Sequence, residues 1–252
     1  SYAGATANDT TETITITVDD GHGGTTTKSV TAPVSPITFA GSGTAGVQLG
    51  PDGTIYQTTS TGDATSGYTT TVTAISPIGT SATTTITGAP VGGIKIAPDG
   101  ATYQTTATGD LSFIVDPDSY TTTVTAGTVS YTTAGAPRSG IQFGPDGTAY
   151  QTTYTGDGNG GYITTVISIS PTQALPPIEV AGFPNSGVLI GLDGTVYQTT
   201  TTYDPATNSD TYHVAAINPA GTTTSTAVTG LVVGGGAQVG PDGIAYLTII
   251  TG

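Results

Sequence analysis

The feature that most constrains this chain is a five-fold repeat built around an Asp-Gly pair. Each copy has a short apolar stretch, the Asp-Gly pair and a strand-like stretch that contains tyrosine. The copies are GVQLGPDGTIYQTT, GIKIAPDGATYQTT, GIQFGPDGTAYQTT, GVLIGLDGTVYQTT and GAQVGPDGIAYLTI, beginning at Gly46, Gly93, Gly140, Gly187 and Gly236. Successive copies of the tyrosine are separated by 47, 47, 47 and 49 residues. This regularity predicts an array of similar structural units.

Each copy predicts a β-hairpin. Before the turn, apolar residues alternate with other residues, as at Val47 and Leu49, which is typical of a strand with one buried face. Pro51, Asp52 and Gly53 then supply the turn, because proline presets φ at the first corner and glycine accepts a left-handed backbone. The segment IYQTT continues as the second strand of the hairpin.

Two further strands are predicted in each unit, after a loop rich in Gly and Asp. The third strands begin at Tyr68, Tyr120, Tyr162 and Tyr212. The fourth strands begin at Thr83, Ser130, Pro177 and Ser225. Four strands in about 47 residues match one blade of a β-propeller.

The ends of the chain predict how the array closes. The last copy stops after two strands, while TTTKSVTA and SPITFAG, from Thr25 and Ser35, resemble the third and fourth strands of the repeat. If these two halves pair, the array becomes a ring without free strand edges. We therefore predict an all-β, five-bladed β-propeller of four-stranded blades, closed by N-terminal strands that pair with the C-terminal half blade. An open β-repeat array is the alternative.

The predicted domain organisation follows from where each repeat begins and ends in the sequence. An N-terminal β-hairpin segment occupies residues 1–24, and the propeller occupies residues 25–252. The propeller is divided into a half blade 25–45, repeats 46–92, 93–139, 140–186 and 187–235, and a half blade 236–252.

Charge and composition exclude several classes of function. The chain has three basic and seventeen acidic residues, for a net charge of -14. Nucleic-acid binding depends on Lys and Arg that neutralise phosphates, so we expect no nucleic-acid partner. No apolar run is long enough for a bilayer span, so we expect no membrane insertion. The absence of cysteine excludes disulfides and thiolate chemistry.

Aspartates are the candidate metal ligands. The turn aspartates Asp52, Asp99, Asp146, Asp193 and Asp242 are interpreted as turn residues whose side chains bond their own backbone. The acidic loops between the second and third strands offer a better set, because Ca²⁺ prefers oxygen ligands such as carboxylates. The predicted calcium ligands are Asp63, Asp110, Asp116, Asp118, Asp157 and Asp204. The other interpretation of these residues is that they are solvated loop acids.

The repeated tyrosines are the candidate ligand-binding residues, because sugar sites combine aromatic faces with polar groups. They are Tyr56, Tyr103, Tyr150, Tyr197 and Tyr246. The competing interpretation is that a tyrosine at one position of every blade packs neighbouring blades together.

No catalytic residues are predicted. His22 and His213 are the only histidines available as a general base, and no Gly-x-Ser-x-Gly nucleophile motif is present. The chain is therefore expected not to be an enzyme.

The Asp-Gly-x-x-Tyr pattern resembles the repeats of bacterial NHL-like and YVTN-like β-propellers, over about residues 35–252. This resemblance implies a fold more than a function, because propellers serve as enzymes, lectins and scaffolds.

A second resemblance lies in residues 12–30, ETITITVDDGHGGTTTKSV, which look like the last hairpin of a cadherin-like or Ig-like domain of a large bacterial surface protein. It implies an extracellular location at the bacterial surface, within a longer chain or assembly. The expected function is a non-enzymatic structural, adhesive or assembly module with a protein or glycan partner. The alternative is a multivalent carbohydrate-binding propeller.

Overall fold

A computed structural model describes residues 11–19, 24–33, 39–109, 116–219, 221–229, 231–232 and 237–250. The chain divides into two compact units, Ser1–Ala40 and Gly41–Gly252. The fold is all-β, as predicted, and its sheets are antiparallel. Within the described residues the helical content is a single 3₁₀ turn, η1 (Pro117–Ser119).

The first unit contains a hairpin of two nine-residue strands, β1 (Thr11–Asp19) and β2 (Thr25–Pro33). They pair along their whole length, from Thr11 opposite Pro33 to Asp19 opposite Thr25. The hairpin therefore extends past the predicted boundary at residue 24. It also includes the strand that we predicted would join the C-terminal half blade. Pairing with a neighbour a few residues away closes a much smaller loop and costs less chain entropy.

In the second unit, each of the first four repeats folds into a five-stranded sheet. Repeat 1 comprises β3 (Ser42–Gly43), β4 (Gln48–Leu49), β5 (Ile55–Asp63), β6 (Gly67–Ile75) and β7 (Ser81–Thr87). Its strand order is β3-β5-β6-β7, and β4 also pairs with β5. The short strands β3 and β4 thus share one edge of β5, whereas the prediction placed a single strand there.

The next three repeats have the same topology. Repeat 2 comprises β8 (Ala89–Pro90), β9 (Lys95–Ile96), β10 (Thr102–Thr108), β11 (Thr121–Ala126) and β12 (Val129–Ala134). Repeat 3 comprises β13 (Ala136–Pro137), β14 (Gln142–Phe143), β15 (Ala149–Gly156), β16 (Tyr162–Ile169) and β17 (Ile178–Ala181). Repeat 4 comprises β18 (Phe183–Pro184), β19 (Leu189–Ile190), β20 (Val196–Asp204), β21 (Ser209–Ile217) and β22 (Thr223–Thr229).

The C-terminal half repeat forms two small sheets. β23 (Leu231–Val232) pairs with β26 (Ile249–Ile250), and β24 (Gln238–Val239) pairs with β25 (Ala245–Tyr246). In the described residues, these strands pair only with one another and not with β2.

The Asp-Gly turn has the predicted structure. In repeat 1, the Gly53 N–H donates to the Gly50 carbonyl at 3.0 Å, and Gly53 has a φ of +81°. The Asp52 carboxylate accepts from the Thr54 N–H at 2.9 Å and from the Thr54 hydroxyl at 2.8 Å. The same N–H to carboxylate bond forms at Asp99, Asp146, Asp193 and Asp242. These aspartates are therefore confirmed as turn residues.

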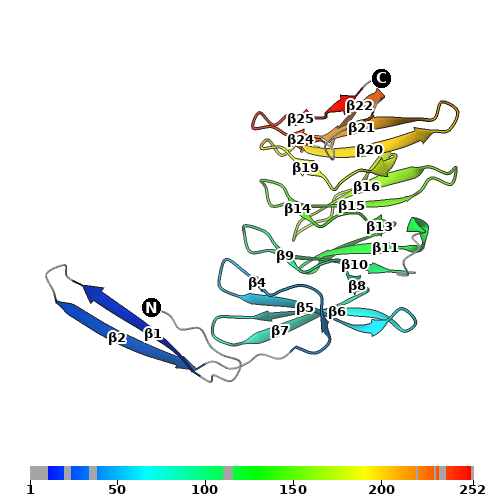
Figure 1. Cartoon of the computed structure of the whole chain (residues 1–252). Helices are drawn as coiled ribbons and strands as arrows, with labels where there is room; N and C mark the ends of the chain where they lie inside the picture. Colours follow the sequence, from blue (N-terminus) through cyan, green and yellow to red (C-terminus); the bar gives the residue numbers. More distant parts are fainter. Residues whose placement is uncertain are drawn as a thin grey trace. The chain divides into compact units, whose positions relative to one another are not determined.

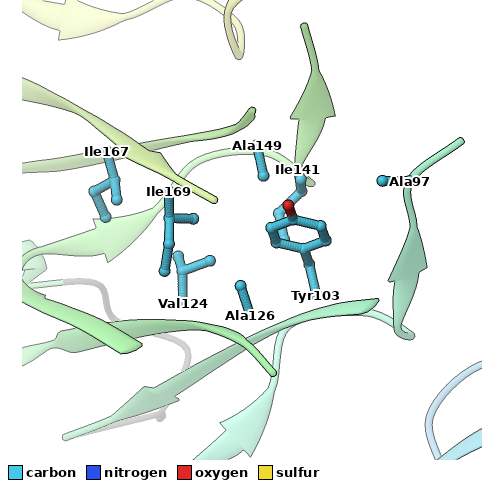
Figure 2. Packing of buried hydrophobic residues seen from close by; sticks show 8 residues of the cluster. All are labelled: Ala97, Tyr103, Val124, Ala126, Ile141, Ala149, Ile167 and Ile169. Carbon is cyan, nitrogen blue, oxygen red and sulfur yellow. The ribbon is translucent and has the colours of Figure 1, made fainter. Parts of the chain in front are cut away.

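The sheets of the second unit follow one another in chain order, from cyan to red in Figure 1. The hydrophobic core lies between consecutive sheets. Figure 2 shows one cluster, in which Tyr103, Val124 and Ala126 of repeat 2 pack with Ile141 and other residues of repeat 3. Extensive contacts among the described residues link each sheet to the next one, and no closed ring is seen in them. The five-bladed arrangement is thus not confirmed.

Candidate functional site

A ladder of buried Gln and Thr side chains joins the repeats. The glutamines follow the repeated tyrosine and are at most 8% exposed: Gln57, Gln104, Gln151 and Gln198. Within its own repeat, the Gln104 amide donates to the carbonyls of Thr105 at 2.9 Å and Gly92 at 3.2 Å. The Gln104 Oε1 accepts from the Thr58 hydroxyl of repeat 1 at 3.0 Å. One side chain therefore connects β10 and the bend between β8 and β9 with the preceding sheet.

The same bond recurs at the next two repeat boundaries. The Thr105 hydroxyl donates to Gln151 Oε1 at 3.2 Å, and the Thr152 hydroxyl donates to Gln198 Oε1 at 2.8 Å. A buried polar group is costly unless it is hydrogen-bonded, so the ladder fixes the register between neighbouring sheets.

The ladder ends at the fifth copy, where Leu247 replaces the glutamine. The hydroxyl of Thr199, the next threonine in the series, is buried and has no hydrogen-bond partner in the described part of the chain. The sequence difference at one position thus explains the orphaned hydroxyl in the preceding repeat.

The repeated tyrosines pack the repeats together. Tyr103 is fully buried and Tyr150 is 9% exposed, and burial raises the pKa of both phenols. The hydroxyl of Tyr103 donates to the Gly147 carbonyl at 3.2 Å, in the Asp-Gly turn of the next repeat. Tyr197 makes the equivalent bond to Gly243 at 2.8 Å. A buried side chain has no surface for a ligand, so Tyr103 and Tyr150 serve packing.

The other two tyrosines named as ligand-binding candidates are more accessible. Tyr56 is half-buried. Tyr246 lies in the C-terminal half repeat and is 55% exposed. Its hydroxyl donates to Asp242 of its own turn. The five tyrosines therefore do not form five equivalent ligand sites.

The loop aspartates stabilise their own loops. The Asp63 carboxylate accepts from the N–H groups of Thr65 at 2.9 Å and Ser66 at 2.7 Å. The Asp204 carboxylate accepts from the Ala206 N–H at 2.9 Å. The bond from the Ser66 N–H lowers the pKa of Asp63, and a bond from the Thr207 hydroxyl at 2.8 Å, together with the Ala206 N–H, lowers the pKa of Asp204.

The remaining predicted calcium ligands that the structure describes also accept hydrogen bonds from backbone N–H groups. Asp116 caps η1, and Asp118 accepts from the Gly156 N–H at 2.6 Å. Asp157 accepts from the N–H groups of Asn159 and Gly161, each at 2.8 Å. Asp110 lies outside the described residues. Over the described ranges, no three acidic or histidine side chains are grouped to hold a metal ion. The calcium site therefore stays a prediction.

His213, one of two candidate bases, lies on β21 with its Nε2 3.1 Å from the Thr202 hydroxyl. The other, His22, lies outside the described residues.

A groove of about 810 Å³ lies between repeats 3 and 4. It is lined by the loop after β15, by the start of β18 and by the facing ends of β20 and β21. Tyr203 and Tyr162 line it and are 59% and 39% exposed. No equivalent aromatic groove was predicted from the sequence.

Three aromatic rings form a cluster beside this groove. Phe183 packs edge-to-face with Tyr154 at 5.0 Å and with Tyr162 at 5.2 Å between ring centroids. The Arg138 guanidinium lies 4.9 Å from the Phe183 ring centroid, and its Nε donates to the Pro184 carbonyl at 3.2 Å. Repeat 3 thereby holds the Phe183 ring of repeat 4 from two sides.

These residues break the repeat pattern. Phe183 stands where Ala89 and Ala136 stand in the other Gly-x-Pro segments. Tyr203 stands where repeats 1, 2 and 3 have Gly62, Gly109 and Gly156. Gly62 has a φ of +94°, and an added Cβ there would lie 2.0 Å from the Gly67 carbonyl oxygen.

In repeat 4, Tyr203 pairs with Asp210 without the left-handed backbone of Gly62, since Asn208 is the only non-glycine with a positive φ among the described residues. The hairpins were predicted from their recurring residues, and these positions near the loop lie beyond them. A comparison of all the strands, residue by residue, would have found both changes.

The polar groups of the groove complement its rings. Asp157 and Asp210 supply carboxylate oxygens, and Asn185 supplies an amide. The Asn185 Oδ1 accepts from the Thr201 hydroxyl at 2.7 Å, while its Nδ2 makes no hydrogen bond within the described residues. None of the side chains that line the groove is basic.

No protein-family model matches the chain, and no curated protein has a significantly similar sequence. The described residues include no helix that is long and apolar enough to cross a membrane.

Proposed function

We propose that this chain is a non-enzymatic structural and adhesive module of a bacterial surface protein. The observation that carries the proposal is the Gln–Thr ladder, which repeats one buried hydrogen bond at three successive boundaries. A scaffold needs the same interface many times, whereas an enzyme needs one distinctive site. The scarcity of basic residues and the surface-protein resemblance of residues 12–30 support the same function.

Within this proposal, the repeats form an open array. Contacts such as those between β6 and β8, β17 and β20, and β19 and β24 link consecutive repeats, as an open array and a ring both require. Among the described residues, no comparable contact links repeat 1 to the C-terminal half repeat, which supports the open array.

Distances between spin labels test the arrangement. The chain has no cysteine, so paired cysteine variants label it specifically. Four exposed positions occupy the same place in repeats 1 to 4: Thr85, Thr132, Glu179 and Ala227. Labels at position 85 and at each of the other three positions report the spacing by pulsed dipolar spin resonance.

An open array predicts three distances that increase in steps, each about 10 Å for stacked sheets. A five-fold ring predicts equal distances from the first blade to the third and to the fourth, by symmetry. Equal values for the 85–179 and 85–227 pairs would therefore overturn the open array.

A further inference from the structure

We infer that the groove between repeats 3 and 4 binds an uncharged oligosaccharide. The inference rests on the adhesive part of the proposed function and names its ligand class. It uses residues other than the five repeated tyrosines, and it places one site on the chain rather than one on each repeat.

The size of the groove suits a ligand of two or more sugar rings. Its volume of about 810 Å³ lies in the range of roughly 300–1,000 Å³ that is usual for small-molecule sites. Its walls combine the loop after β15 with the ends of the paired strands β20 and β21, which hold side chains more firmly than free loops do.

The aromatic rings supply the apolar contact. Tyr162 and Tyr203 line the groove and are 39% and 59% exposed, and Phe183 lies beside Tyr162. The face of an aromatic ring carries partial negative charge, which attracts the polarised C–H groups on one face of a sugar. The edge-to-face packing of Phe183 and the guanidinium of Arg138 hold this surface in place before a ligand arrives.

The polar groups require a ligand that both donates and accepts hydrogen bonds. The carboxylate of Asp210 makes no side-chain hydrogen bond within the described residues and only accepts, while the free Asn185 Nδ2 only donates. A sugar hydroxyl does both. An ammonium group would suit the carboxylates and the rings, but it has no acceptor for Asn185.

Charge excludes acidic ligands. The groove contains Asp157 and Asp210 and no basic lining residue, on a chain with a net charge of -14. An acidic saccharide or a phosphate would be repelled without a compensating cation.

The positions of the aromatic residues argue for a role beyond folding. Repeats 2 and 3 fold with alanine at the Phe183 position and with glycine at the Tyr203 position. Stacking of the repeats therefore does not need these rings. Large exposed side chains that are unnecessary for the fold are typical of binding sites.

The test is binding of the full chain to an array of neutral and acidic glycans, followed by calorimetric titration of the strongest neutral oligosaccharide. Two variants restore the residues of the sister repeats, Phe183→Ala and Tyr203→Gly. We expect each to raise Kd about tenfold or more. The matched control is Tyr246→Ala, since Tyr246 is 55% exposed but lies in the C-terminal half repeat, outside the groove. We expect its Kd to stay within about twofold of the original.

A second measurement does not depend on the variants. Hydrogen exchange of the unmodified chain with the bound oligosaccharide should slow in residues 157–162 and 201–210, and not in repeat 1. The inference is overturned if no neutral glycan binds, if only acidic glycans or a tetramethylammonium probe bind, or if binding survives both groove variants. The label distances for the array do not depend on this result, so the two proposals fail separately.

Discussion

The boundary between repeats 1 and 2 and the boundary between repeats 3 and 4 share the buried Gln–Thr hydrogen bond, here called the buried middle. They differ at the residue before the proline of the Gly-x-Pro segment, here called the outer end. Both are joined by a Thr hydroxyl that donates to a Gln side chain, Thr58 to Gln104 and Thr152 to Gln198. At the outer end, repeat 2 has Ala89 where repeat 4 has Phe183.

The comparison separates two roles within one interface. The buried middle cannot change without leaving polar groups unpaired, so it is the same at both boundaries. The outer end contributes little to stacking and is free to carry a groove. Four predictions test this division, from the largest expected effect to the smallest.

Replacing a glutamine of the shared Gln–Thr ladder should have the largest effect on the unfolding free energy. Gln104→Leu removes three hydrogen bonds, one from the Thr58 hydroxyl and two to the carbonyls of Thr105 and Gly92. Because each hydrogen bond is worth about 0.5–1.5 kcal/mol, we expect a loss of about 3 kcal/mol in unfolding free energy. Urea denaturation measures it. The control Gln48→Leu changes an exposed glutamine, and a similar loss there would contradict the role of the ladder.

Replacing a residue found only at the divergent boundary should have a smaller effect. Arg138→Val introduces the residue that repeat 2 has at this position, Val91. The variant loses the guanidinium contact with Phe183 and one hydrogen bond to Pro184, which together are worth about 1 kcal/mol on an exposed surface. Thermal unfolding measures the change. A loss as large as that of Gln104→Leu would show that the outer end also holds the stack together.

Extending the ladder should stabilise the chain slightly. Leu247→Gln restores the glutamine whose Oε1, in the other repeats, accepts from the threonine hydroxyl equivalent to Thr199. One restored hydrogen bond contributes about 0.5–1.5 kcal/mol. Leu192→Gln, at a side chain that is 79% exposed, is the control. Equal urea midpoints for the two variants would contradict the proposed end of the ladder.

Low pH should destabilise the Asp-Gly turns of repeats 1 and 4 to the same extent. The loss of stability per turn is the smallest of the four effects. Thr54 and Thr195 hold the pKa values of Asp52 and Asp193 below the usual 3.8. Their hydrogen bonds therefore add stability above about pH 4, and this contribution is lost as pH falls through the lowered folded-state pKa.

Unfolding by urea between about pH 6 and pH 2 measures this dependence. Asp52→Asn and Asp193→Asn should each reduce it by a similar amount. A pH dependence that changes in only one of the two variants would show that the turns are not equivalent.

Much of the local structure could be predicted because it depends on short-range chemistry. Pro51, Asp52 and Gly53 fix a turn through φ preferences and a carboxylate that bonds two residues ahead. The alternation around that turn fixes two strands. The sequence offered two partners for β2, the local strand of the hairpin-like segment 12–30 and the C-terminal half blade, and the structure shows the local one.

The candidate site was the least predictable part. The recurring tyrosines were the predicted ligand-binding residues, yet Tyr103 and Tyr150 recur because they are buried between repeats. The groove instead consists of residues that do not recur, such as Phe183 and Tyr203. Residues that recur in every repeat are those that every interface between repeats needs. Residues that differ from the repeat are where a single binding site is found.

The sequence by itself determined the period, the all-β class and the Asp-Gly turns, because these follow from residue preferences within a few positions of the chain. Only the tertiary structure decided which side chains meet across a boundary. Thr58 and Gln104 are 46 residues apart, and their hydrogen bond exists because two sheets stack in one register. The groove has the same origin, since Tyr162 and Phe183 come together only when the third and fourth sheets pack.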